Sequence, residues 1–497
     1  MQPRVDRHRL TFVLLAWLGG ATVCFAQDVA RMDQVVQSYV SNGTFAGSVL
    51  VARGSDVIVS KGYGLAHVEW NVPSGPSARF KVASITKQFT AASILLLEER
   101  GRLKIDDLVK THLPEAPATG DRITLFHLLT HTAGFPSLQS PPTGRQAPVE
   151  SADGTVAGFV TALMQRPLES QPGERFNYTN SGYFVLGHLI QKLTGKSYET
   201  FLRVNIFTPL GMKDSALDSP SVIARRAGSY TVTPNGLVNA SYASDRIVPN
   251  TAGLYSTTED LMRWQNGLYG GKVISKASLQ KMTTPFKGDY GLGVYIRTVD
   301  GRRAATHGGG VPPFANLTYF FDRGVSVVVL GNLSVAPSAE IAAYLGALAH
   351  GDTVQLMSEK KAITLAPSVL ARYAGVYQFA VGQTMTIRVE GGQLAAQPER
   401  GTALPLLAES ETRFFQPRHP CRGRMVGWPR ARRAGARGRG SPTRITDDTS
   451  LSARRRSPRR RSGQGDSSRR CATSVTAAVV GGPCTSRPSP GSRSRPA

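Results

Sequence analysis

The chain of 497 residues is 41% hydrophobic, which is enough apolar material for a large buried core and for one to three domains. This composition excludes a chain that is disordered throughout. The formal net charge of +25 suggests a nucleic-acid-binding protein, but the charge is unevenly placed. Residues 416–497 hold 20 arginines, no lysine and three acidic residues, so this segment carries +17 and the first 415 residues carry only +8.

Residues 1–26 are typical of a secretory signal peptide that is removed after Ala26. After a basic start, the apolar run Leu10–Leu18 is too short to span a bilayer comfortably. The alternatives are an uncleaved anchor and lipid attachment at Cys24, which the bulky Val23 before it disfavours. Cleavage predicts a protein exported to the periplasm or out of the cell, with no transmembrane span left afterwards.

The body that follows, residues 27–350, is predicted to be an α+β domain of two lobes. Apolar spacing favours a helix over 29–39 and another over 89–99, and the stretch 125–210 is mainly helical with loops. Short apolar runs bounded by turn residues favour strands over 47–52, 57–60, 318–321 and 325–330. Strands therefore flank a helix-rich middle.

Residues 365–415 predict a small, partial β-rich domain. The alternating run Met385–Val389, the turn Gly391-Gly392 and the run Leu394–Gln397 indicate a β-hairpin. The segment 416–497 is rich in Arg, Pro, Gly and Ser and holds only six Leu, Ile and Val residues, so we expect it to be disordered. Its abrupt change of composition is typical of translation in a wrong reading frame; a genuine basic tail is the alternative.

Cysteine and histidine usage excludes several kinds of site. The body from Gln27 to Phe415 has no cysteine, which excludes a disulfide scaffold and a cysteine–metal site there. Its histidines include one pair at His-x-x-x-His spacing, His127 and His131, but no third histidine or cysteine lies within ten residues of them to complete a ligand set. No metal or other cofactor is therefore expected.

The first candidate catalytic motif is Ser84 with Lys87 at the start of the helix 89–99. A spacing of three places both side chains on one helix face. A serine hydroxyl needs a neighbouring base, and a lysine can be that base if burial lowers its pKa. The alternative is a helix-capping serine beside a solvated lysine.

The second motif, Tyr178-Thr-Asn180, lies in the helical middle. A tyrosine hydroxyl near a lysine can relay a proton, and the Asn180 amide can accept from Lys87 and donate to a substrate. The alternative is a polar loop whose tyrosine packs on the surface.

The third motif is His307-Gly308-Gly309-Gly310, just before a predicted strand. Glycines let a substrate backbone approach a strand closely. The N–H groups of Gly310 and Ser84 could together form an oxyanion hole. A phosphate-binding loop is disfavoured because no Lys-Ser/Thr follows, and a lone His307 is often only structural.

The order of these motifs resembles that of the serine β-lactamase-related family, which includes class C β-lactamases, penicillin-binding proteins, D-aminopeptidases and carboxylesterases. Further segments agree with the family pattern: Leu128–Gly134, Gly253–Thr257, Tyr290–Gly293 and Val329–Asn332. The resemblance covers about Val29 to Ala349, and residues 365–415 resemble the β-rich appendage that often follows this domain. It implies a β-lactamase/transpeptidase-like fold, with an antiparallel sheet flanked by helices and joined to a helix-rich lobe.

The resemblance also implies roles for the motif residues. Ser84 would form an acyl-enzyme, while Lys87 and Tyr178 would move protons. The remaining residues would bind the substrate or its oxyanion: Asn180, His307, Gly309 and Gly310. His131 and Asp260 are interpreted as structural.

One departure from the family bears on the substrate. True β-lactamases usually carry Lys-Thr/Ser-Gly where this chain has His307-Gly308-Gly309, and a histidine is mostly neutral at pH 7. The sequence therefore favours an esterase, amidase or D-peptidase with weak β-lactam turnover. Arg302 and Arg303 are candidate ligands of a substrate carboxylate, but a solvated strand end is the favoured interpretation.

Three other functions stay open. They are a working class C-like β-lactamase, an inactive relative that binds peptidoglycan, and a nucleic-acid-binding protein acting through its arginine-rich tail. The expected partner is a small-molecule or peptide substrate, one source being the cell wall. No specific nucleic-acid partner is expected, and the sequence does not predict an oligomeric state.

Overall fold

A computed structural model describes residues 28–136, 156–233, 235–240, 249–310, 314–380, 383–398 and 403–415, together with two short strands, β19 (Arg444–Ile445) and β20 (Leu451–Ser452). The predicted signal peptide and nearly all of the arginine-rich tail lie outside the described residues. Within the described residues, no helix is both long and apolar enough to cross a membrane.

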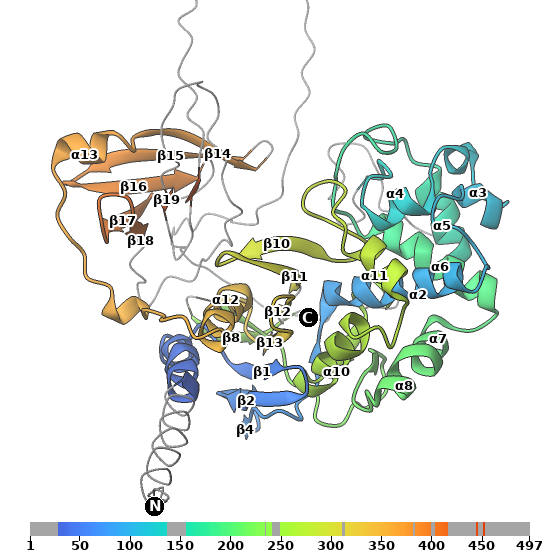
Figure 1. Cartoon of the computed structure of the whole chain (residues 1–497), viewed down its shortest axis with the longest axis horizontal. Helices are drawn as coiled ribbons and strands as arrows, with labels where there is room; N and C mark the ends of the chain where they lie inside the picture. Colours follow the sequence, from blue (N-terminus) through green and yellow to red (C-terminus); the bar gives the residue numbers. More distant parts are fainter. Residues whose placement is uncertain are drawn as a thin grey trace, which may run out of the picture.

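A six-stranded antiparallel sheet forms the centre of the body, in the order β10-β11-β12-β13-β1-β2 (Figure 1). Its strands are β1 (Gly47–Arg53), β2 (Asp56–Tyr63), β10 (Tyr295–Val299), β11 (Arg302–Gly310), β12 (Phe314–Phe320) and β13 (Val325–Gly331). The first and last strands of the body, β1 and β13, pair with each other inside this sheet, where Val49 lies opposite Val329. Because β13 is buried along its whole length, its sequence is almost purely aliphatic.

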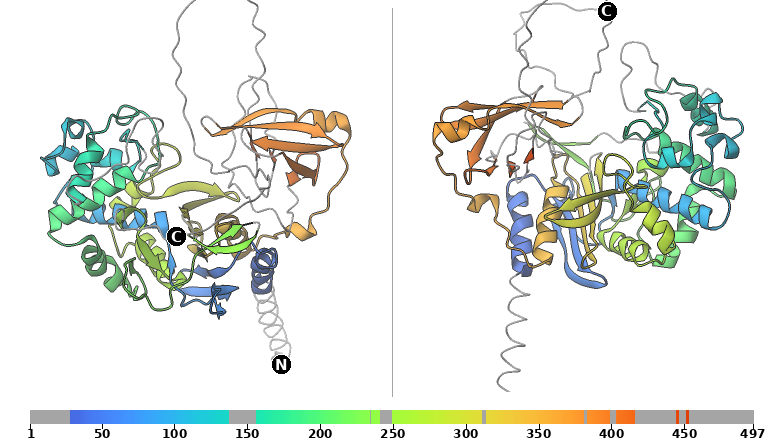
Figure 2. Two further views of the ribbon diagram at one scale, coloured as in Figure 1. Left: turned by 180° about the vertical axis from the view of Figure 1, so that it is seen from behind. Right: turned by 45° about the horizontal axis from the view of Figure 1, so that its top comes forward.

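Each face of this sheet has its own hydrophobic core. Alternate residues of β1 divide between them: Val49 and Val51 pack on one side, Leu50 and Ala52 on the other. The first side is covered by the N-terminal helix, residues 28–41, and by α12 (Ser338–Ala349) (Figure 2). The second side meets the helical part of the molecule.

That helical part contains the long buried helix α2 (Thr86–Glu99) and the lobe around it. Its other helices are α3 (Val109–His112), α4 (Leu125–Leu129), α5 (Val156–Met164), α6 (Ser181–Thr194), α7 (Tyr198–Leu202), a π-helical segment (Arg203–Phe207), α8 (Thr208–Leu210), α9 (Pro249–Ala252), α10 (Thr258–Tyr269) and α11 (Lys276–Met282). Single turns of 3-10 helix lie at Ala83–Ile85, Ala118–Asp121 and Met357–Glu359.

The structure also contains small sheets of two or three strands. β9 (Leu254–Ser256) lies between β5 (Phe80–Lys81) and β6 (Ala216–Leu217), so it fixes the chain just before Ser84. The hairpins are β3 (Leu65–His67) with β4 (Val72–Pro73), and β7 (Tyr230–Thr233) with β8 (Gly236–Asn239).

The C-terminal unit is a five-stranded antiparallel sheet with a small core of its own. It consists of α13 (Pro367–Ala371), β14 (Gly375–Ala380), β15 (Gln383–Glu390), β16 (Gln393–Pro398), β17 (Leu404–Ala408) and β18 (Phe414–Phe415). The predicted hairpin is confirmed, since Val389 pairs with Leu394. Its turn glycines, Gly391 and Gly392, have φ of 57° and 79°, as a two-residue hairpin turn of this kind requires.

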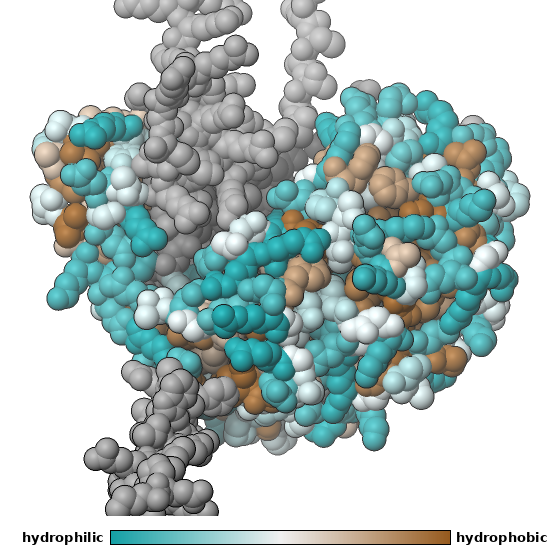
Figure 3. Space-filling view, viewed as in Figure 1, coloured by the Kyte–Doolittle hydropathy of each residue, from teal (hydrophilic) through white to brown (hydrophobic). Residues whose placement is uncertain are grey.

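In the view of Figure 1, the C-terminal sheet (orange) lies on the left and the helical lobe (teal and green) lies on the right. The face shown in Figure 3 is mainly hydrophilic, with hydrophobic residues scattered over it. The predicted α+β class is confirmed, since an antiparallel sheet packs against a helix-rich lobe.

Candidate active site

The candidate nucleophile, Ser84, lies in the 3-10 turn Ala83–Ile85 directly before α2, whereas the sequence placed it at the opening of the helix itself. Ala83 has a φ of 46°, in the left-handed region that disfavours a residue with a Cβ by roughly 1–2 kcal/mol. The Val82 N–H, donating to Leu254 O at 2.9 Å, fastens this turn to β9. Backbone strain that the surrounding structure holds in place is typical of functional sites.

Lys87 is completely buried one turn beyond Ser84. Its ammonium group donates to Ser84 Oγ at 3.1 Å, to Asn180 Oδ1 at 2.8 Å and to the Thr251 carbonyl at 3.0 Å. Burial nevertheless lowers the Lys87 pKa from 10.5 to about 7, because among the described residues no carboxylate offsets the loss of water. Near neutral pH a large fraction of Lys87 is therefore an unprotonated amine beside a serine hydroxyl.

Tyr178 lies over the same lysine, with its ring centroid 5.1 Å from Lys87 Nζ. Burial raises the pKa of its phenol, and the neighbouring Ser84 hydroxyl only partly opposes this rise. The phenol is thus protonated at neutral pH. Among the described residues, its buried hydroxyl has no partner at hydrogen-bond geometry.

Asn180 is the residue that begins α6, and its position brings the second motif against the first. Its Oδ1 is the Lys87 acceptor, as the sequence predicted. With Oδ1 turned to the lysine, the amide NH₂ is the group left to donate to a substrate.

His307 lies on β11 and is buried. Its Nδ1 donates to Gly308 O at 2.8 Å, which leaves Nε2 to accept from the Tyr290 hydroxyl at 3.2 Å. Burial first, and then the nearby positive charge of Lys87, lower the His307 pKa to about 3. The hydroxyl bonded to His307 is thus that of Tyr290, while the Tyr178 ring lies with its centroid 6.1 Å from that of His307.

The three glycines after His307 differ in how much room they have. A Cβ at Gly309 would lie 2.4 Å from Val82 O and 3.2 Å from the Ala83 Cβ. At Gly308 the nearest atom would be 3.7 Å away, and at Gly310 there would be none within 4 Å. Gly309 is therefore what lets β11 pack directly on the nucleophile's turn. The paired N–H groups of Ser84 and Gly310 stay a prediction.

The two arginines weighed as carboxylate ligands are used elsewhere. Arg302 is paired with Asp352 at 2.6 Å, and Arg303 donates to Thr283 O at 2.9 Å. The arginine nearer the motifs is Arg297, which is exposed and lies 4.0 Å from the ring centroid of Tyr295.

Asp260 is buried at the start of α10 and has structural partners. It accepts from the Asp214 N–H at 2.7 Å and the Ser215 hydroxyl at 2.8 Å, and it pairs with Arg263. These bonds tie the loop before β6 to the helix. The structural interpretation of Asp260 agrees with them.

Two residues of the site were not predicted as functional. Thr251 acts through its backbone carbonyl, which any residue type supplies, so no side-chain signal existed. Tyr290 stood in a segment noted only for its family pattern, although it is fully buried and bonded to His307. Its neighbour Tyr295 completes a ring cluster with Tyr178 and His307.

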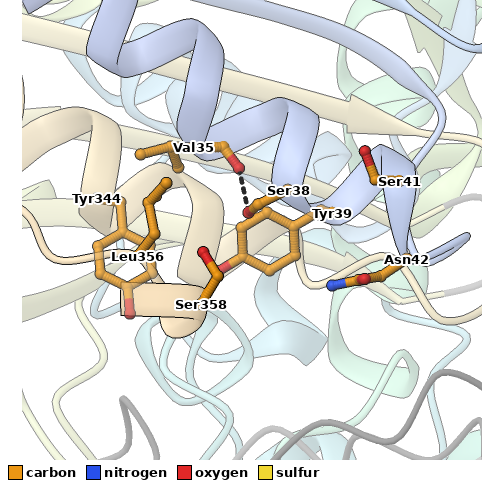
Figure 4. Close-up of a pocket in the computed structure, with 8 residues that line it drawn as sticks. All are labelled: Val35, Ser38, Tyr39, Ser41, Asn42, Tyr344, Leu356 and Ser358. Atoms are coloured by element: carbon orange, nitrogen blue, oxygen red, sulfur yellow. Dashed lines mark hydrogen bonds between the residues drawn. The ribbon is translucent and has the colours of Figure 1, made fainter. Parts of the chain in front are cut away.

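A cavity of about 250 Å³ lies elsewhere, between the N-terminal helix and the region of α12. Figure 4 shows its lining, in which Tyr39 and Tyr344 face Leu356 and Ser358. It is on the opposite side of the central sheet from Ser84, so it is not the candidate active site. Within the described ranges, no three side chains of His, Cys, Asp and Glu are grouped so that they could hold a metal ion.

An antiparallel sheet packed on a helical lobe, with a serine–lysine pair between them, defines the β-lactamase-type fold. The sequence profile of the Beta-lactamase family matches residues 32–351, and that of a domain of unknown function, DUF3471, matches residues 359–431. The chain belongs to the Beta-lactamase family.

Relatives with names or structures support this assignment. Penicillin-binding protein 4* of Bacillus subtilis is 30% identical over 401 residues, which are 75% of this chain and 88% of that protein. The octameric penicillin-binding protein homologue of Pyrococcus abyssi is 28% identical with a TM-score of 0.59, over 76% of this chain and 90% of that one. A D-stereospecific amidohydrolase from Streptomyces sp. has the same fold (24% identity, TM-score 0.54, 65% and 99% covered).

Proposed function

We propose that this protein is an exported serine hydrolase that cleaves esters or amides through an acyl-enzyme on Ser84. One observation carries the proposal: the Lys87 amine, with a pKa lowered to about 7, is in hydrogen-bond contact with the Ser84 hydroxyl. A base must be unprotonated at working pH and within reach of the proton it takes, and Lys87 meets both conditions.

In acylation, Ser84 Oγ attacks the substrate carbonyl carbon and its proton passes to Lys87 Nζ. The carbonyl oxygen becomes the oxyanion, for which the N–H groups of Ser84 and Gly310 are the proposed donors. As the tetrahedral intermediate collapses, the bond to the leaving group breaks and that group takes a proton from Tyr178. Tyr178 suits this donor role because its raised pKa keeps the phenol protonated, and Lys87 then returns a proton to it.

In deacylation, water attacks the ester carbonyl of Ser84 and gives up one proton to the Lys87–Tyr178 pair. The bond to Ser84 Oγ then breaks, and the serine regains a proton as the carboxylic acid leaves. Throughout, the amide NH₂ of Asn180 would hold the substrate. No step needs a metal or another cofactor.

The favoured substrates are small esters and D-peptides rather than β-lactams. The third motif offers a neutral His307 where β-lactamases usually supply a lysine, so the β-lactam carboxylate loses its fixed positive partner. Export and a cell-wall-derived substrate fit the leader sequence and the penicillin-binding relatives. The main alternative is a genuine class C-like β-lactamase, which the family assignment favours.

The test is a direct comparison of two substrates with the full chain. A short-chain p-nitrophenyl ester and a chromogenic cephalosporin are each incubated with the wild type and with Ser84→Ala. Ester release that far exceeds cephalosporin opening, and that is lost in Ser84→Ala, is the expected result. Faster cephalosporin opening would make the protein a β-lactamase. Hydrolysis that survives in Ser84→Ala would refute the mechanism.

A further inference from the structure

One buried histidine, His131, holds the peptide segment around Tyr178 from both sides. Its backbone carbonyl accepts from the Asn177 N–H at 2.9 Å, and its ring Nδ1 accepts from the Thr179 N–H at 3.3 Å. The residues immediately before and after Tyr178 are therefore both bound to the same residue. The ring of His131 also lies against that of Tyr178, with centroids 4.3 Å apart.

The backbone of His131 makes this double contact possible. The residue follows the end of α4 with a φ of 56°, in the left-handed region that few residues other than Gly, Asn, Asp and His adopt. This conformation ends the helix and turns the chain, so that carbonyl and ring can both meet the 177–179 segment.

The protonation of His131 is fixed by the same contacts. Nδ1 accepts a hydrogen bond, so in the neutral ring the proton is on Nε2, which is buried and has no hydrogen-bond partner among the described residues. Burial, with the nearby positive charge of Lys87, keeps the His131 pKa well below its ordinary value. A leucine or phenylalanine would pack here without an unpaired N–H, so packing alone does not account for histidine.

Tyr178 depends on this support because, among the described residues, its hydroxyl has only the Ser84 hydroxyl as a neighbour to interact with, and that contact falls short of hydrogen-bond geometry. The position of the hydroxyl beside Ser84 is set by the backbone of residues 177–179 and by the rings against it. We infer that His131 is a positioning residue for Tyr178, holding the phenol at the distance from Ser84 that proton transfer requires. This inference rests on the proposed acyl-enzyme mechanism, and it assigns His131 no proton transfer of its own.

Two variants of the full chain, His131→Gly and His131→Asn, separate positioning from packing. Both tolerate the left-handed backbone and both remove the imidazole ring, but only His131→Asn keeps a hydrogen-bond acceptor at the δ position. For each, kcat and KM are measured with a p-nitrophenyl ester from pH 5 to 9, the rate of Ser84 labelling with a fluorophosphonate probe is followed, and the thermal midpoint is recorded.

We expect His131→Gly to lower kcat and the labelling rate by about 100-fold at nearly unchanged KM, since misplacement of a catalytic group by about 1 Å has this effect. His131→Asn should recover at least tenfold of that loss. Both variants should keep the activity rise near pH 7 that Lys87 produces.

Three results would overturn the inference. Wild-type kcat in His131→Gly would show that Tyr178 needs no such support. Equal losses in both variants, in step with their thermal midpoints, would reduce His131 to packing. Loss of the activity rise near pH 7 in both variants would make His131 itself the titrating group. If the wild type is labelled at Ser84 but does not cleave esters, the proposed substrate is wrong, and the comparison of labelling rates between the variants stays valid. If the wild type is not labelled at Ser84, both proposals are wrong.

Discussion

The helical side and the strand side of the candidate site contrast in charge and in hydrogen bonding. On the helical side, Lys87 has three acceptors, from the turn before α2, from the start of α6 and from α9. On the strand side, β11 offers a neutral His307 and a run of glycines. The two sides meet where Gly309 packs on the carbonyl of Val82.

This difference indicates a division of labour. In the proposed mechanism, the ionisable group that activates the nucleophile comes from the helical lobe, where burial lowers its pKa. The strand would contribute shape and the Gly310 N–H, which need no charge. Each of the following changes alters one side and leaves the other in place.

The largest effect is expected from Lys87→Met, which removes the base of the helical side. We expect kcat with a p-nitrophenyl ester to fall by about 100- to 10,000-fold, the usual contribution of a general base. In the wild type, activity should rise as the pH passes through about 7, because Lys87 is active only when unprotonated. Steady-state rates from pH 5 to 9 test both statements. A variant with wild-type kcat would exclude Lys87 as the base.

The same lysine should also make stability depend on pH. Its folded pKa of about 7 lies below the unfolded value of 10.5, so between these pH values the unfolded state binds more protons. The free energy of unfolding should therefore rise with pH from about 7 toward 10, by at most about 1.4 kcal/mol per unit. Urea unfolding of the wild type and Lys87→Met at several pH values measures the difference. Parallel curves would show that the lysine is charged in the folded state.

On the strand side, Gly309→Ala should disturb the contact between β11 and the nucleophile's turn. The added Cβ meets Val82 O at 2.4 Å, and we expect a loss of about 1–3 kcal/mol in stability together with reduced kcat. Gly308→Ala is the matched control, since its nearest neighbour is 3.7 Å away. Chemical unfolding and ester hydrolysis of the pair are the measurements. Similar behaviour of the two variants would contradict this account of the contact.

The smallest effect is expected from introducing a positive charge at position 307, on the strand side. His307→Lys should lower KM for a cephalosporin by a few-fold, up to about tenfold, by attracting its carboxylate. His307→Gln, which stays neutral, should leave KM and the pH profile as in the wild type. Initial rates with a cephalosporin and a neutral ester distinguish a specific gain from a general one. No gain with the lysine would show that charge at this position does not limit β-lactam binding.

Much of the architecture could be predicted from local pattern. The aliphatic run 325–330 is a central strand, and the hairpin at Gly391-Gly392 pairs as expected, because two-residue turns fix strand register. Helix 86–99 begins near its predicted start. What local pattern missed is the short 3-10 turn that carries Ser84, since its conformation depends on contacts with β9 and β11.

Only part of the site could be predicted, because the rest depends on contacts between segments that are distant in the sequence. Ser84, Lys87, Tyr178 and Asn180 could be named because motifs that recur in one order carry information beyond any single match. The partners of Arg302 and Arg303, Asp352 and the Thr283 carbonyl, lie in other segments of the chain, so local pattern did not predict them. The roles of Thr251 and of the Tyr290–His307 bond depend on segments that only folding brings together.

The sequence by itself determined the α+β class, the family resemblance and the residue types available for chemistry, because periodicity and motif order are local properties of the chain. Only the tertiary structure decided which of those residues meet and in what protonation state. Lys87 has a pKa near 7 because the helical lobe encloses it without a carboxylate, and His307 is neutral because it is buried near that lysine. Burial and distance between remote segments set both, and neither is encoded at a single position.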